Sequence, residues 1–191
     1  MATRVIGLAG RPGSGKSTVA RALAGKPGVE AIDLDRVAWQ TYATGTSTYE
    51  RLVARFGPGI LSDDGGIDRG ALASIALADA AARQDLEAIV HPAVGDRLSE
   101  LKCSAKRRGV SVLVVEGALL ASSPHVDRSI FDAVFWLEAS EETRRNRLRA
   151  GCREGHSDRM GGVKPGDWAI VVDAEAAISQ VVECVWRSIE R

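Results

Sequence analysis

Gly10-Arg-Pro-Gly-Ser-Gly-Lys-Ser17 is the stretch that decides the fold, because it fits the phosphate-binding P-loop pattern G-x-x-x-x-G-K-[ST]. Before it, the apolar run Val5–Ala9 predicts a short strand, and after it Thr18–Ala24 predicts a helix. In this setting the backbone N–H groups of the loop and the N-terminus of the helix attract phosphate. We therefore expect the chain to bind a nucleoside triphosphate.

The chemistry of the loop residues predicts how they meet the nucleotide. The ammonium group of Lys16 is expected to reach the β- and γ-phosphates, and the hydroxyl of Ser17 to hold Mg²⁺. The residues predicted to bind the nucleotide are Gly10, Pro12, Gly13, Ser14, Gly15, Lys16, Ser17 and Thr18.

The composition restricts the partners that this chain can have. It has 191 residues, which suits a single domain, and 45% of them are apolar, enough for a sizeable core. Basic and acidic residues number 25 each, so the chain has no overall basic charge that would favour nucleic acid. The three cysteines match neither a disulfide framework nor a zinc site. We expect a cytoplasmic protein, a monomer or weak oligomer, with a small-molecule substrate and no nucleic-acid or membrane partner.

The rest of the chain alternates predicted strands with predicted helices. Ser111–Glu116 is a continuous β-branched run, typical of a strand buried on both faces of a parallel sheet. Asp68 and Ser140 are residue types that begin helices as N-caps. The remaining predicted strands are 29–34, 133–138 and 168–172, and the predicted helices include 69–77, 80–90, 92–108 and 178–189. This alternation predicts an α/β sandwich with a mostly parallel sheet.

Three motifs beyond the P-loop resemble those of the dephospho-CoA kinase family. Ile32-Asp-Leu-Asp35 resembles I-D-x-D, Asp64–Leu72 resembles D-G-x-L-D-R-x-x-L, and Leu86–Pro92 resembles L-x-x-I-x-H-P. Many kinases share the P-loop, whereas these motifs in this order are much more specific. The resemblance spans nearly the full chain.

The resemblance implies both a fold and an activity. The implied fold is that of a P-loop NTPase: one domain over 1–191, a three-layer α/β sandwich with a five-stranded parallel sheet. It includes a helical acceptor-binding insertion at about 36–108 and a short lid at about 151–166. The implied activity is transfer of the γ-phosphate of ATP, with Mg²⁺, to the ribose 3′-hydroxyl of dephospho-CoA, which gives coenzyme A.

Carboxylates at the ends of two predicted strands have implied roles in this reaction. Asp35 resembles the family's catalytic base, placed beside the P-loop, which would accept or align the proton of the acceptor hydroxyl. Since Arg36-Val-Ala follows, Asp35 could also be a helix N-cap. Asp33 is implied to bind substrate or to support the metal. Glu116 is a candidate to hold Mg²⁺ through water, with an ordinary strand-end acid as the alternative.

Basic residues and one histidine complete the implied site. Arg147 resembles the lid-helix arginine and is expected to act in catalysis with Lys16 and Asp35. Arg69, His91 and Pro92 are implied to bind the acceptor. Without the resemblance, Arg69 would be interpreted as a solvated first-turn residue, and His91-Pro92 as a junction between two helices. One of Arg153, Arg159 and Lys164 is expected to reach the phosphates when the lid closes.

The chain departs from the family pattern at several positions. Trp39 stands where the family often has a basic residue, and Ala118 falls in a segment that is usually D-x-P-L-L. Gly151-Cys152 replaces the usual Arg-Asp, Ala174 replaces an asparagine, and the lid segment is several residues short. The sequence therefore leaves two alternatives open: another P-loop kinase acting on a nucleoside, nucleotide or sugar, or a non-catalytic ATP-binding regulatory protein.

Overall fold

The structure is a computed structural model that describes residues 3–117, 120, 127–151 and 164–190. The chain divides into two units. The first unit comprises 1–34, 101–122 and 128–191, and the second comprises 35–100 and 123–127. The first unit contains the β-sheet and the P-loop, and the second consists mainly of helices.

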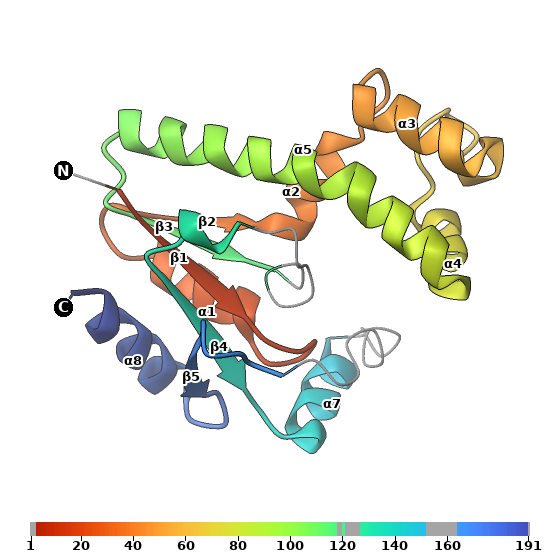
Figure 1. Ribbon diagram of the computed structural model, residues 1–191. Coiled ribbons are helices and arrows are strands. Elements are labelled where there is room, and N and C mark those ends of the chain that lie inside the picture. The colour runs from red at the N-terminus through yellow and green to blue at the C-terminus, as the bar shows by residue number, and fades with distance from the viewer. Residues whose placement is uncertain (1–2, 118–119, 121–126, 152–163, 191) are drawn as a thin grey trace. The chain divides into compact units, whose positions relative to one another are not determined.

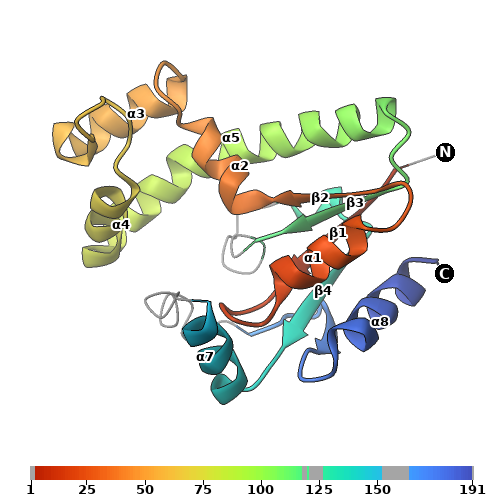
Figure 2. The same cartoon turned by 180° about the vertical axis from the view of Figure 1, so that it is seen from behind.

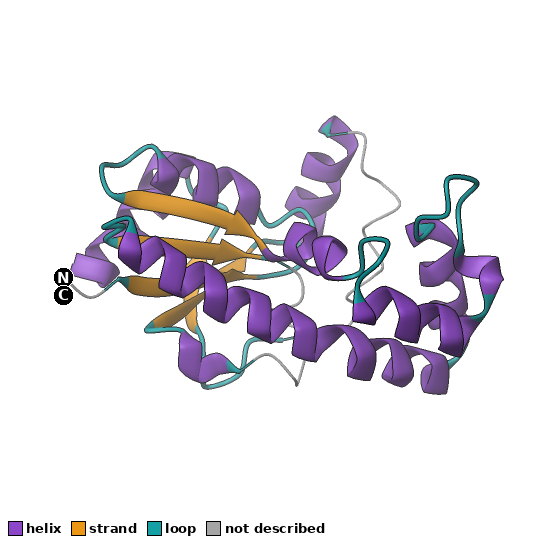
Figure 3. Ribbon diagram, turned by 90° about the horizontal axis from the view of Figure 1, so that it is seen from above, coloured by secondary structure: helices purple, strands orange, loops and turns teal. Residues whose placement is uncertain are grey.

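A five-stranded parallel sheet forms the centre of the first unit (Figure 1). Its strands are β1 (Arg4–Ala9), β2 (Val29–Asp33), β3 (Val112–Glu116), β4 (Ala133–Glu138) and β5 (Ile170–Asp173). They lie in the order β2-β3-β1-β4-β5, and Figure 3 shows their arrowheads pointing the same way. Because all pairs are parallel, the carboxyl ends of the strands meet at one edge of the sheet. The five-stranded parallel sheet predicted from the sequence is confirmed.

Helices cover the sheet of the first unit. The helices α1 (Lys16–Ala24) and α8 (Ile178–Glu190) lie side by side on one face (Figure 2). Their buried side chains share one apolar core with the strands, including Val19, Leu23, Val185, Leu8 and Phe135. The C-terminal end of α5 (Ala80–Arg107), from residue 101 on, lies on the opposite face (Figures 1 and 2).

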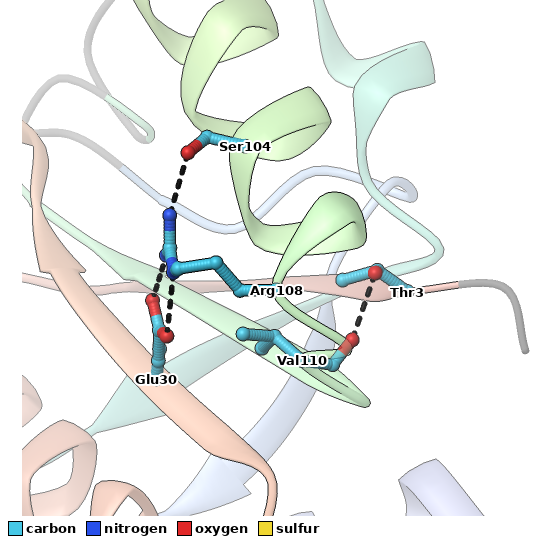
Figure 4. A network of polar contacts seen from close by, with 5 residues as sticks. All are labelled: Thr3, Glu30, Ser104, Arg108 and Val110. Carbon is cyan, nitrogen blue, oxygen red and sulfur yellow. Dashed lines mark hydrogen bonds and ion pairs between the residues drawn. The ribbon is translucent and has the colours of Figure 1, made fainter.

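A polar network joins the end of α5 to the edge of the sheet that carries the strand N-termini (Figure 4). The guanidinium of Arg108 forms an ion pair with Glu30 of β2 and donates to the hydroxyl of Ser104 at 2.6 Å. The hydroxyl of Thr3 donates to the carbonyl oxygen of Val110 at 2.8 Å. These contacts lie at the opposite edge from the P-loop, so they support the fold and not the site.

The second unit is built from short helices with well-defined ends. Its elements are α2 (Leu34–Thr41), α3 (Ser47–Phe56), the 3-10 turn η1 (Pro58–Ile60), α4 (Arg69–Ala78) and the first three quarters of α5. Asp68 caps α4, as predicted, by accepting from the N–H groups of Gly70 and Ala71 at 2.7 and 3.1 Å. The hydroxyl of Tyr49 donates to the carbonyl of Gly65 at 2.7 Å, which ties α3 to the turn before α4.

The helix α5 shows that the prediction of separate helices at 80–90 and 92–108 was wrong. It is one helix, Ala80–Arg107, with Pro92 inside it. A proline in a helix interior removes one hydrogen bond and costs about 3 kcal/mol. Buried apolar side chains continue on both sides of it, at Ile89, Val90, Val94 and Leu98. Burying each contributes about 1.5–3 kcal/mol, so burial outweighs the cost of the proline and the helix continues.

Two other predicted boundaries shift by one or two residues. β2 ends at Asp33, because Leu34 already begins α2. The last strand is Ile170–Asp173 and not 168–172, since its pairing with β4 runs from Phe135 to Glu138. Among the described helices, none combines the length and apolar character that crossing a membrane requires.

Candidate functional site

The P-loop forms a tight cradle at the carboxyl edge of the sheet. Gly13 has φ +80°, and a Cβ added there would lie 2.5 Å from the carbonyl oxygen of Arg144. Gly10 has φ +143°, and its added Cβ would lie 2.7 Å from the carbonyl oxygen of Leu137. Any side chain at either position would clash with backbone, so the loop needs glycine to approach β4 and the helix α7 (Glu141–Ala150) this closely.

Two polar side chains define the interior of this loop. The ammonium of Lys16 donates to the carbonyls of Gly10 and Arg11 at 2.9 and 3.2 Å, which closes the loop on itself. Ser14 is only 1% exposed, and its hydroxyl has no hydrogen-bond partner among the described residues. A buried polar group without a protein partner is uncommon and fits a site that a ligand or water completes. The glycine cradle and this hydroxyl are therefore compatible with a bound phosphate.

Ser17 and Thr18 lie in the first turn of α1, immediately after Gly15 and Lys16. Gly15, at φ 97°, is the residue from which the helix begins. Thr18 donates its N–H to the carbonyl of Gly15 at 3.0 Å. The N-terminus of a helix attracts an anion through the N–H groups of its first residues and the helix dipole. The structure thus brings all the nucleotide-binding residues predicted from the sequence, Gly10 to Thr18, into one loop and helix start.

Two arginines of the helix α7 (Glu141–Ala150) contact the P-loop backbone. Arg147 donates to the carbonyls of Ser14 at 3.4 Å and Ala174 at 2.8 Å, so it joins the loop to the segment after β5. Arg144 is 6% exposed and donates to the carbonyl of Pro12 at 3.3 Å. Sequence reasoning singled out Arg147 and missed Arg144. The two arginines are three residues apart, which places both on one face of a helix, and this spacing could have identified Arg144 from the sequence.

The N-terminus of α7 is held by a cap and by one carboxylate. Ser140 caps the helix, as predicted, by accepting from the N–H of Thr143 at 3.1 Å. Glu175 accepts from the N–H of Ser140 and from the hydroxyl of Thr143. These hydrogen bonds, first that from the backbone of Ser140, lower the pKa of the Glu175 carboxyl from its usual value. They keep α7, and with it Arg144 and Arg147, against the loop.

Asp33 and Glu116 stand side by side where β2 and β3 end. They are partners in the strand register, and Glu116 is also the register partner of Leu8, two residues before Gly10. Glu116 is 8% exposed. The described residues hold no cluster of three or more metal-ligating side chains. Mg²⁺ prefers hard oxygen ligands and commonly takes one or two from carboxylates and the rest from phosphate and water, so Ser17, Asp33 and Glu116 fit this ion.

Asp35 begins the second unit, inside the first turn of α2. Because α2 starts at Leu34, the alternative in which Asp35 is the helix N-cap was wrong. One turn further along, Trp39 is 44% exposed, and the guanidinium of Arg69 lies over its ring, 4.0 Å from the centroid. Burial raises the pKa of Tyr42 to about 12, with Arg69 lowering it and Asp35 raising it. These four side chains form a cluster in the second unit.

His91 and Pro92 lie within α5, and His91 is 5% exposed. The alternative that they mark a junction between helices was therefore wrong. Most of the predicted lid falls outside the described residues, as do Ala118, Cys152, Arg153 and Arg159. Of its two described ends, Gly151 is the C-cap of α7 and Lys164 is exposed.

Comparison with known proteins identifies relatives of this chain. The model of the dephospho-CoA kinase family matches residues 4–160. The dephospho-CoA kinase of Geobacter sulfurreducens is 41% identical over 180 residues, which are 93% of this chain and 87% of that protein. The one from Symbiobacterium thermophilum is 39% identical over 78% of this chain and 62% of that protein. Among solved structures, TT1252 from Thermus thermophilus superimposes with a TM-score of 0.74 at 25% identity, covering 99% of this chain and 97% of that one.

Proposed function

Since the chain belongs to the dephospho-CoA kinase family, we propose that it transfers the γ-phosphate of ATP to the ribose 3′-hydroxyl of dephospho-CoA. The acceptor oxygen forms a bond to the γ-phosphorus, and the bond from that phosphorus to the bridging oxygen of ADP breaks. The products are coenzyme A and ADP. The observation that carries the proposal is the P-loop, a glycine cradle whose backbone carbonyls accept hydrogen bonds from two arginines of α7. The family of the chain gives this loop its proposed reaction.

The first unit holds the nucleotide in this proposal. Lys16 donates to the carbonyls of its own loop, and its flexible ammonium exchanges these acceptors for the β- and γ-phosphates when the nucleotide binds. Arg147 is an exposed residue, so its guanidinium can contact a phosphate while it remains bonded to the carbonyl of Ser14. Ser17, with Glu116 and Asp33, would hold Mg²⁺, which neutralises charge on the phosphates when it is bound.

The second unit supplies the acceptor side in this proposal, which keeps the expected acceptor-binding region at about 36–108. Asp35 accepts or aligns the proton of the 3′-hydroxyl. Arg69 binds an anionic group of the acceptor, for which the planar guanidinium is suited. His91 and Pro92 shape the acceptor site from within α5.

The test is direct turnover of dephospho-CoA. Purified protein with ATP, Mg²⁺ and dephospho-CoA should produce coenzyme A and ADP in equal amounts. The Lys16→Ala variant, prepared in the same way, controls for contaminating kinases and should lose about 10²–10³-fold in rate, as expected when a charge-stabilising donor is removed. Nucleosides and shorter nucleotides should give no comparable rate. ATP hydrolysis that dephospho-CoA does not stimulate would contradict the proposal.

A further inference from the structure

The contact between Trp39 and Arg69 is unusual because both residues are exposed. Trp39 is 44% exposed, which is high for a large aromatic side chain, and Arg69 is an exposed residue at the start of α4. Their 4.0 Å contact joins α2 to α4, although the two residues lie thirty positions apart in the sequence. An exposed cation–π contact contributes little to folding, about 0.5–1 kcal/mol. The stability of the fold therefore does not explain why the indole of Trp39 is exposed to solvent.

The geometry of this contact leaves the hydrogen-bonding capacity of Arg69 available. A guanidinium that stacks on a ring uses its flat face, while its N–H groups point outward in the plane. Among the residues that the structure describes, no carboxylate lies within salt-bridge distance of Arg69. The ring thus contacts the centre of the guanidinium, and no described carboxylate competes for its N–H donors. Such a preorganised fork suits a phosphate group.

The position of Trp39 connects this pair to the reaction. Asp35 and Trp39 are four residues apart in α2, so their side chains emerge from the same face, one turn from each other. The charges of Asp35 and Arg69 both act on Tyr42, so the two groups lie in one neighbourhood. If Asp35 meets the 3′-hydroxyl, the groups attached to the same ribose come within reach of Arg69. In dephospho-CoA, the anionic group on that ribose is its 5′-diphosphate.

We propose that Trp39 is a positioning residue that orients Arg69 to bind the diphosphate of the acceptor. This inference rests on the proposed function, and it adds a role for a position where the family often has a basic residue. In this proposal, the contact with the acceptor is made by Arg69 and not by Trp39. It acts through the guanidinium, so its effect depends on the presence of Arg69.

Equilibrium binding of dephospho-CoA, measured by titration calorimetry without ATP, tests this role. Trp39→Leu removes the ring face and should weaken binding about 2- to 5-fold, the scale of an exposed cation–π contact. Trp39→Phe keeps a ring and should retain most of the affinity. Arg69→Gln should weaken binding at least as much as Trp39→Leu. Adding Trp39→Leu to Arg69→Gln should cause no further loss, because the positioned group is already absent.

Phe56→Leu is the matched control, because it removes another cation–π contact of the second unit, that between Arg55 and Phe56. It should leave dephospho-CoA binding unchanged, and the affinity for a non-hydrolysable ATP analogue should be equal in all variants. Unaltered binding by Trp39→Leu, or additive losses in the double variant, would overturn the inference. Turnover is measured separately: a wild type that shows this binding pattern without making coenzyme A would contradict the proposed function alone.

Discussion

At the scale of single residues, the candidate site consists of groups expected to contact phosphate and one carboxylate proposed to accept a proton. Lys16 and Ser14 lie in the P-loop of the first unit, whereas Asp35 opens the first turn of α2 in the second. Asp35 is half-buried and belongs to the cluster with Trp39, Tyr42 and Arg69. Because Asp35 is not the cap of α2, its removal should affect the reaction more than the helix.

Replacing Asp35 with Asn tests its proposed role as the base. The change keeps the shape of the side chain and removes its charge and basicity. We expect kcat to fall by about 10²–10⁴-fold, the usual contribution of a positioned acid or base. The KM for ATP should change little, and a loss confined to kcat marks an interaction made in the transition state.

Asp85→Asn is a suitable comparison, since Asp85 is a surface carboxylate of the same unit that pairs with Arg55 at 2.6 Å. Exposed ion pairs contribute little, so this variant should retain its activity. Equal kcat values for wild type and Asp35→Asn would leave Asp35 without a catalytic function.

At the scale of secondary-structure elements, α7 is the helix that supports the P-loop. One of its faces, with Arg144 and Arg147, contacts the loop. Arg145, on another face, pairs with Glu141 on the surface, both groups being more than half exposed. The run of arginines is therefore partly in contact with the P-loop and partly solvated, as the spacing within the helix requires.

A pair of matched variants separates these two faces. Arg147→Met should raise the Kd for ATP by about tenfold, because it removes a charge-assisted hydrogen-bond donor next to the loop. Arg145→Met should leave the Kd within about twofold, since an exposed i,i+4 pair is worth only a few tenths of a kcal/mol. Calorimetric titration with ATP measures both, and similar losses in the two variants would argue against a specific role for Arg147.

The N-terminus of α7 should make stability depend on pH through Glu175. Hydrogen bonds from Ser140 and Thr143 lower the pKa of this carboxyl below its usual 4.5. A lowered pKa means that the ionised group stabilises the fold at pH values above 4.5, and that this contribution disappears as pH falls through the lowered pKa. Glu175→Gln should therefore reduce Tm at pH 7, and the difference from wild type should shrink toward pH 3.

Glu190→Gln, a substitution of an exposed acid at the end of α8, provides the reference for this series. It should change Tm little at either pH. A Tm difference for Glu175→Gln that stays constant between pH 7 and pH 3 would show that the Glu175 carboxyl does not titrate as expected.

At the scale of the whole molecule, the division into two units suggests that each substrate orders its own unit. Hydrogen exchange should show this directly. A non-hydrolysable ATP analogue alone should slow exchange in the P-loop and α7, and dephospho-CoA alone should slow it in α2 and α4. Protection of the same segments by both ligands, added singly, would contradict the assignment of one substrate to each unit.

Local signals in the sequence were sufficient for much of this fold. The P-loop pattern, the apolar runs of β1, β3 and β4, and the caps Asp68 and Ser140 depend on residues within a few positions of one another. Backbone geometry and short-range hydrogen bonds act over this distance, so the sequence by itself determined these elements and the P-loop. Their alternation with helices was enough to predict that the sheet is parallel.

Only the tertiary structure decided the features that depend on distant partners. The helix α5 continues through Pro92 because its apolar stripe is buried on both sides. Arg144 reaches Pro12 from 132 residues away, and Arg69 reaches the ring of Trp39 from another helix. At such positions, packing against a distant segment contributes a few kcal/mol, which is more than local propensity does. The pattern of neighbouring residues does not indicate which distant segment makes that contact.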